Sequence, residues 1–171
     1  MRHYLVLGLA LAILPGCLTL GPSVERATIR AKEQVAPALV HVRPVKEVFE
    51  EGQRAEVLAV GSGFIISPDG YVVTNEHVAG QSKYARCVLY NQEELEAEVV
   101  GIDPYTDIAL LKLQTDRQDL PVVRLGASSD LTAGQTVLAL GSPHGLARSV
   151  SRGIISVTDR YLESCGEMVA P

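Results

Sequence analysis

Large aromatic and reactive side chains are scarce in this chain of 171 residues. It contains no Trp, two Phe and three Cys. A core of large rings is therefore excluded, and the apolar residues that remain are chiefly Val, Leu and Ile, which favour strands. The cysteines and the four histidines are scattered, without the paired spacing of metal ligands. We therefore expect no metal site and no other cofactor.

Positive charge is also in short supply. Lys and Arg number 15 against 20 Asp and Glu, giving a net charge of −5 without a basic patch, so nucleic acid is not an expected partner. Apolar residues make up 47% and charged residues 20%, which is typical of a globular protein. The 15 Gly and nine Pro indicate many turns. Together these features predict an all-β chain, long enough for one domain with a real core.

Residues 1–17 have the features of an export signal. A short polar start precedes an apolar run at residues 4–14, which is too short to cross a bilayer in the usual way. The sequence Leu14-Pro15-Gly16-Cys17 that follows resembles a bacterial lipoprotein signal, in which the cysteine is lipidated and becomes the new N-terminus. We expect lipidation at Cys17, with a cleaved signal peptide and an incidental cysteine as the alternative. Both predict export to the periplasm or cell envelope.

The other two cysteines do not form a disulfide framework. Cys87 alternates with Ala85 and Leu89 on one face of a predicted strand, which indicates a small buried apolar residue. Cys165 lies near the end of the sequence, where it either is free or pairs with a cysteine outside this chain.

The remaining sequence reads as a linker followed by two sets of strands. Residues 18–37 are a linker with a short helix at 22–36, which Ser23 can cap and Pro37 ends. A first β-barrel is predicted for residues 38–113, with a charged loop at 44–56. A polar break at 114–121 separates it from an incomplete second barrel at 122–171. The predicted strands are 38–42, 57–66, 71–74, 85–90, 95–100 and 108–113 in the first set, and 122–125, 136–141 and 153–157 in the second.

Two local signals shape the centre of the first set. The sequence Gly61-Ser62-Gly63 interrupts an apolar run and predicts a bend or a close backbone contact. The sequence Ser67-Pro68-Asp69-Gly70 predicts a tight turn in which the glycine takes a positive φ. The resulting hairpin would deliver His77 just past the end of its second strand.

His77 and Asp107 are the candidate catalytic residues. His77 closes a hydrophobic strand in Thr74-Asn75-Glu76-His77-Val78, and Asp107 opens the next strong strand. Each residue alone is more often a turn residue or a cap. Their order, however, matches that of a chymotrypsin-type triad. In such a site the imidazole takes the proton of a serine nucleophile, and the carboxylate accepts the other ring N–H.

Five sequence blocks in order resemble the HtrA/Do (DegP-like) family of trypsin-fold serine proteases, over about residues 35–158. Residues 61–78 resemble its His block and 99–112 its Asp block; residues 125–131, 137–146 and 153–156 resemble the start of its second barrel. The resemblance implies a trypsin-like double β-barrel, with the first barrel complete, the second truncated and a short N-terminal helix. It further implies a serine endopeptidase of envelope quality control that degrades unfolded or misfolded polypeptides, and a homotrimer.

The chain departs from the family pattern in three places. Glu76 stands where the family often has Asn, and Ser142 and His144 stand where Asn and Phe are usual. The third departure is the absence of the Gly-Asn-Ser-Gly-Gly block that carries the nucleophile. The serines after Asp107 do not lie between glycines in a tight elbow; these are Ser128, Ser129, Ser142, Ser149, Ser151, Ser156 and Ser164.

Two functions therefore stay open. The first is an HtrA-type serine endopeptidase, of which this chain is an N-terminal part, inactive alone because the serine and the oxyanion hole lie elsewhere. The second is a non-catalytic lipoprotein that uses the first barrel as a binding module. The intact pair of His77 and Asp107 favours the first. His41 and His144 are interpreted as an exposed strand residue and a turn substitution.

Overall fold

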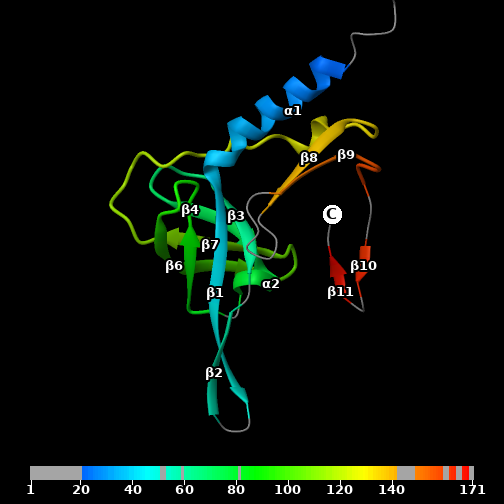
Figure 1. The fold of residues 1–171 in the computed structure, drawn as a ribbon. Coiled ribbons are helices and arrows are strands. Elements are labelled where there is room, and N and C mark those ends of the chain that lie inside the picture. The colour runs from blue at the N-terminus through cyan, green and yellow to red at the C-terminus, as the bar shows by residue number, and fades with distance from the viewer. Residues whose placement is uncertain are drawn as a thin grey trace, which may run out of the picture.

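The structure is a computed structural model that describes residues 21–50, 53–58, 60–80, 82–141, 149–159, 162–164 and 167–169. It opens with helix α1 (Gly21–Val35), followed by a single 3₁₀ turn, η1 (Ala36–Ala38). The predicted helix is confirmed, and it ends where Ala36 and Pro37 begin the 3₁₀ turn. Figure 1 shows α1 leading away from a compact β-unit, with the rest of the chain largely in strands.

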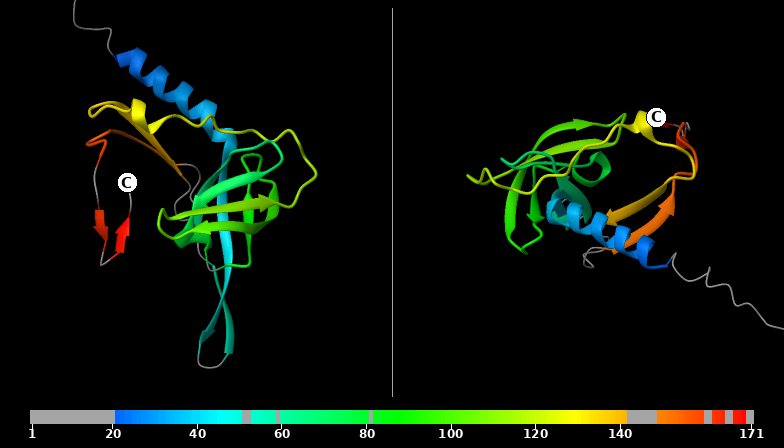
Figure 2. Two further views of the ribbon diagram at one scale, coloured as in Figure 1. Left: turned by 180° about the vertical axis from the view of Figure 1, so that it is seen from behind. Right: turned by 90° about the horizontal axis from the view of Figure 1, so that it is seen from above.

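The β-unit is a closed barrel. One seven-stranded sheet has the order β2-β1-β3-β4-β7-β6-β5, and β5 returns to pair with β1, so six of these strands close into a ring (Figures 1 and 2). Closure leaves the ring strands with partners on both sides, which removes exposed sheet edges. This confirms the predicted first barrel and the all-β class. The strands are β1 (Leu39–Glu50), β2 (Gln53–Leu58), β3 (Gly61–Ile65), β4 (Tyr71–Asn75), β5 (Tyr84–Val88), β6 (Glu94–Asp103) and β7 (Ile108–Leu113).

The predicted charged loop at residues 44–56 is wrong. β1 runs on to Glu50 and pairs with β2 in an antiparallel hairpin that projects from the barrel (Figure 1). Pro44 and the charges indicated a loop, but Pro44 lies in register with Ala85 of β5, and residues 45–50 pair with β2. The segment pairs first with β5 and then with β2, and this pairing outweighs its low strand propensity.

Alternating side chains of the barrel strands fill its interior. Ala109, Leu111 and Leu113 of β7 are all buried, as the period of two requires. Cys87 is buried as predicted, and this burial raises the pKa of its thiol to about 12, so it is an unreactive core residue. His41, predicted as an exposed strand residue, is instead half-buried in β1.

The turn between β3 and β4 has the predicted form. The Gly70 N–H donates to the Ser67 carbonyl at 3.0 Å, and Gly70 has a φ of 101°. The Lys112 ammonium of β7 lies 3.0 Å from the Asp69 carboxylate and 4.7 Å from the centre of the Tyr71 ring. These contacts fix the turn to the neighbouring strand β7.

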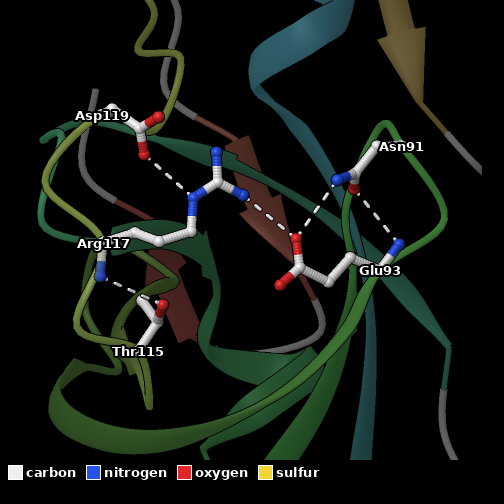
Figure 3. A network of polar contacts seen from close by, with 5 residues as sticks. All are labelled: Asn91, Glu93, Thr115, Arg117 and Asp119. Carbon is white, nitrogen blue, oxygen red and sulfur yellow. Dashed lines mark hydrogen bonds and ion pairs between the residues drawn. The ribbon is translucent and has the colours of Figure 1, made fainter.

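The segment after β7 is held on the barrel. The predicted strand at residues 122–125 is not formed, because the backbone there bonds to the barrel rather than to a strand partner. The N–H groups of Leu120 and Val123 donate to Pro68 and Ile65 at 3.2 and 3.0 Å. Arg117 bonds Glu93 at 3.0 Å and Asp119 at 2.9 Å, as Figure 3 shows.

The remaining strands form two small separate sheets. β8 (Thr136–Gly141) pairs with β9 (Ser149–Ile154), and β10 (Leu162–Ser164) with β11 (Glu167–Val169). The prediction of residues 136–141 is confirmed, whereas the strand predicted at 153–157 is displaced to 149–154, because pairing with β8 sets its bounds. Figure 1 places α1 beside β8. Cys17, Ser142, His144 and Cys165 lie outside the described residues.

Candidate active site

The pairing of β4 with β7 brings the two candidate residues together. The strands are antiparallel, and Asn75 at the end of β4 lies in register with Ile108 at the start of β7. A residue just after β4 and a residue just before β7 must therefore be neighbours, although thirty positions separate them. His77 and Asp107 occupy these two places at one end of the barrel.

His77 lies on a short helix, α2 (Glu76–Ala79), which is anchored by the two residues after it. Val78 and Ala79 are buried in the barrel core. Gly61 of β3 makes room for Val78, since a Cβ on Gly61 would lie 2.5 Å from a Val78 methyl group. The close contact predicted at Gly61-Ser62-Gly63 is thus confirmed. Its consequence is that α2 is fixed by packing while the His77 side chain remains 69% exposed.

The carboxylate of Asp107 contacts His77 through both oxygens. Oδ2 lies 2.7 Å from the ring Nδ1, and Oδ1 accepts the His77 backbone N–H at 2.9 Å. A carboxylate can only accept, so Nδ1 carries the proton of the neutral imidazole. The lone pair then resides on Nε2, which can take a proton from a third group.

Asp107 is held in an uncommon backbone conformation. Its φ is 56°, in the left-handed region that Asp tolerates better than most residues. The preceding loop is shaped by Asp103, whose carboxylate accepts the Tyr105 N–H at 3.0 Å and the Thr106 hydroxyl at 2.8 Å. These bonds, led by that of Thr106, hold the pKa of Asp103 below its usual value.

The surroundings of Asp107 favour its ionised form. The backbone N–H of His77 has the largest effect in lowering the pKa of Asp107, and partial desolvation opposes it. The side-chain hydrogen bond of His77 lowers the pKa of Asp107 further, as do the Asn75 amide and the charge that His77 carries whenever its ring is protonated. The carboxylate is therefore suited to stabilise an imidazolium beside it.

Asn75 is a residue of the site that the sequence analysis missed. Its Nδ2 lies 3.1 Å from Asp107 Oδ2 and 3.2 Å from the Asp107 carbonyl oxygen. The only sequence signal was an amide two positions before the histidine. Its neighbour Thr74 is buried, and donates to the Ser62 carbonyl at 2.8 Å, which ties β4 to β3 beneath the site.

The site consists of an acid–base pair rather than a ligand cage. The described part of the chain has no group of three or more His, Cys, Asp or Glu side chains that could hold a metal ion. A cavity of about 200 Å³ lies at the opposite end of the barrel, beside Ile65, Leu89 and Leu120, so it does not belong to this site. Within the described segments, no helix has both the length and the apolar composition needed to span a membrane.

Comparisons with known proteins agree with this geometry. The model of the trypsin-like peptidase domain matches residues 61–169. A probable periplasmic serine endoprotease, DegP-like, of Pseudomonas fluorescens is 44% identical over 128 residues, covering 69% of this chain and 26% of the relative. Another from Marinomonas sp. is 49% identical over 115 residues, covering 67% and 24%. The chain thus spans about a quarter of the length of these curated relatives.

Solved structures show the same likeness in three dimensions. The HtrA-type protease AlgW with a tripeptide has a TM-score of 0.66 and 35% identity, covering 76% of this chain and 40% of that one. An AlgW variant with a decapeptide has a TM-score of 0.70 and 31% identity, covering 75% and 44%. With both sequence blocks and barrel in agreement, the chain belongs to the trypsin-like peptidase family, in its HtrA/DegP branch.

Proposed function

We propose that this chain forms the His- and Asp-bearing part of a serine endopeptidase of the HtrA/DegP type. The observation that carries the proposal is the 2.7 Å contact between His77 Nδ1 and Asp107 Oδ2 at the end of the barrel. Structural ion pairs also occur in proteins, but this one joins an exposed imidazole to a carboxylate held ionised by its hydrogen bonds.

The proposed chemistry is peptide-bond hydrolysis through an acyl-enzyme. His77 Nε2 takes the proton of a serine hydroxyl as the oxygen attacks the peptide carbonyl, and then gives it to the departing amine. Asp107 keeps the Nδ1–H tautomer and stabilises the imidazolium between these two transfers. A water molecule activated by the same imidazole then releases the acyl group.

We assign the serine and the oxyanion-hole amides to a segment outside these 171 residues. The sequence supports this, because none of the serines that follow Asp107 lies between glycines in the form of a nucleophile turn. The chain alone should therefore not hydrolyse peptide bonds. Any residual rate of a site that lacks one triad member is supplied by the oxyanion hole and substrate binding, and we assign the hole to the same outside segment.

The substrates, location and assembly are proposed from the relatives. The DegP-like relatives are named periplasmic, and the AlgW structures hold peptides, which supports an exported enzyme that acts on unfolded or misfolded polypeptides. A lipid anchor on Cys17 and a homotrimer are the proposed attachment and assembly. The four-residue pattern ending at Cys17 supports the anchor.

A chimera tests the proposed function directly. Residues 1–157 would be followed by the remaining segment of the Pseudomonas fluorescens relative, which is 44% identical to this chain. The chimera should cleave an unfolded protein such as reduced casein and react with a fluorophosphonate. Asp107→Asn should lower kcat by roughly 10⁴-fold, and His77→Ala by roughly 10⁶-fold, because it removes the general base itself.

The same experiment decides between the two functions. A folded chimera that carries a serine and still lacks turnover would remove the assignment of His77 and Asp107, and the binding-module function would replace it. Turnover by residues 1–171 alone, blocked by a fluorophosphonate, would instead place the nucleophile on one of the serines of this chain.

A further inference from the structure

We propose that Asn75 is a positioning residue: its amide joins the carboxylate of Asp107 to the backbone carbonyl of Asp107. This contact fixes the orientation of the carboxylate and, through it, that of the His77 ring. The inference rests on the proposed function and deepens it. Asn75 does not contact the ring of His77 in the hydrogen bonds of the site; it acts through Asp107.

The amide of Asn75 bridges two acceptors of one residue. Its Nδ2 lies 3.2 Å from the Asp107 carbonyl oxygen and 3.1 Å from Asp107 Oδ2. An amide nitrogen carries two hydrogens, so one can serve each acceptor. The bridge thus couples the side-chain torsion of Asp107 to the backbone of the same residue. Among the described residues, no other hydrogen bond of this carboxylate does so.

The orientation of the amide follows from the chemistry of its neighbours. The two atoms that face it are both acceptors, a carbonyl oxygen and a carboxylate oxygen. In the flipped orientation the amide oxygen would point at both and repel both. The NH₂ group must therefore face Asp107, and Asn75→Asp would replace two attractions by a contact between like charges.

Asp107 needs such a lock because little else restrains its side chain. The side chain is 35% exposed, so it is not fixed by packing. Without Asn75, Oδ1 would keep the His77 backbone N–H, and the Asp107 carbonyl would keep the Glu76 N–H at 3.0 Å. Oδ2 would keep only the His77 ring, which moves with the carboxylate. The carboxylate could then turn about Oδ1 and swing Oδ2 away from Nδ1.

The test uses carbon-13 and proton NMR of the full chain, at a concentration where sedimentation shows a monomer. The variants are Asn75→Ala and Asn75→Asp, with Asn91→Ala as the matched control. Asn91 lies in the exposed turn between β5 and β6, where its amide donates to Glu93 at 3.1 Å (Figure 3). It lines the cavity at the end of the barrel opposite His77. The readouts are the carboxyl carbon of Asp107 across a pH titration and the low-field Nδ1–H proton of His77.

We expect Asn75→Ala to raise the pKa of Asp107 and to broaden or remove the Nδ1–H signal, while Asn91→Ala changes neither. Asn75→Asp, which is isosteric, should raise the pKa of Asp107 further. Folded Asn75 variants with an unchanged Asp107 titration and Nδ1–H signal would overturn the proposal. The proposal would also be overturned if both Asn75 variants failed to fold while Asn91→Ala folded, because Asn75 would then be a structural residue. Neither readout uses turnover, so the outcome is independent of the chimera test.

Discussion

At the scale of single residues, the ionisation of Asp107 ties the site to the stability of the barrel. Its pKa is lowered in the folded chain, chiefly by the His77 backbone N–H. A lowered pKa stabilises the folded state above the unfolded value of about 4, and this contribution is lost as the pH falls through the folded value. We therefore expect Asp107→Asn to lower the free energy of unfolding at about pH 7, and the difference from the wild type to shrink toward about pH 3.

Denaturant unfolding followed by tyrosine fluorescence measures this, since the chain has six Tyr and no Trp. Asp116→Asn is the matched control, because Asp116 is an exposed residue of the segment after β7. It should leave the free energy of unfolding unchanged at both pH values. A loss for Asp107→Asn that is equal at both pH values would contradict the linkage argument.

Gly61 is the second residue on which the site depends. A Cβ at this position would lie 2.5 and 2.8 Å from the two methyl groups of Val78, which carries α2 into the core. Gly61→Ala should cost about 1–3 kcal/mol of stability by overpacking. Gly126→Ala is the control, since nothing lies within 4 Å of its added Cβ. Combining Gly61→Ala with Val78→Ala should recover part of the stability that Gly61→Ala loses, because the Val78 methyl groups are removed. If the stability losses of the two variants simply add, the clash between residues 61 and 78 is not the cause.

At the scale of elements, the segment after β7 behaves as part of the first barrel up to Val123. Arg117 bonds Glu93 and Asp119 (Figure 3). Leu120 is buried. The Arg117 side chain is 36% exposed, so solvent screens its ion pairs and Arg117→Ala should change the free energy of unfolding little. The larger effect of Arg117→Ala should be local. The backbone at residues 114–121 should loosen without the ion pairs, and proteinase K should then cleave there.

In the wild type, we expect the first cuts between residues 124 and 160, with the hairpin that carries His77 spared. Arg124→Ala is the control for Arg117→Ala, because Arg124 is exposed and lies beyond the last hydrogen bond of the segment to the barrel. Mass spectrometry of early fragments identifies the sites. Equal cleavage at residues 114–121 in wild type and Arg117→Ala would show that the ion pairs do not hold this segment.

At the scale of the whole molecule, the β8–β9 pair exposes apolar surface that the barrel does not cover. Ile154 at the end of β9 is 60% exposed, and Val157, which follows the strand, is 49% exposed. Exposed apolar residues beside strand edges promote association. We expect residues 1–171 to self-associate, and Ile154→Lys to reduce this in sedimentation velocity. Val100→Lys, at a residue that is 46% exposed on the barrel, should not reduce it. Equal effects of both lysines would point to net charge instead.

The attachment of the whole molecule is tested at Cys17. If this cysteine is lipidated, the protein should sediment with membranes, because several acyl chains give stable anchoring where one does not. Cys17→Ser should release it to the soluble envelope fraction, while Cys87→Ser, at a buried core position, should leave its location unchanged. A wild type that is already soluble after cell fractionation contradicts the anchor.

The sequence by itself determined the elements whose signals are local. Alternation predicted β5 and β7, and the turn at Ser67-Pro68-Asp69-Gly70 follows from residues that set their own dihedral angles. The two residues of the pair were also identifiable, since each lies at the end of a strong strand. Propensity failed at residues 44–56, where residues 45–50 pair with the adjacent β2 in a hairpin. It failed again at 122–125, where the Val123 N–H bonds to the distant Ile65 carbonyl instead of to a strand partner.

Only the tertiary structure decided the geometry of the site. The register of β4 with β7 places Asp107 against His77, and no residue type encodes a register between strands that lie more than thirty residues apart. The same pairing brings Asn75 onto Asp107, a contact that the amide two positions before the histidine did not predict by itself. The physical reason is that strand order and register minimise the energy of the closed barrel as a whole, whereas turns and alternation depend on a few neighbouring residues.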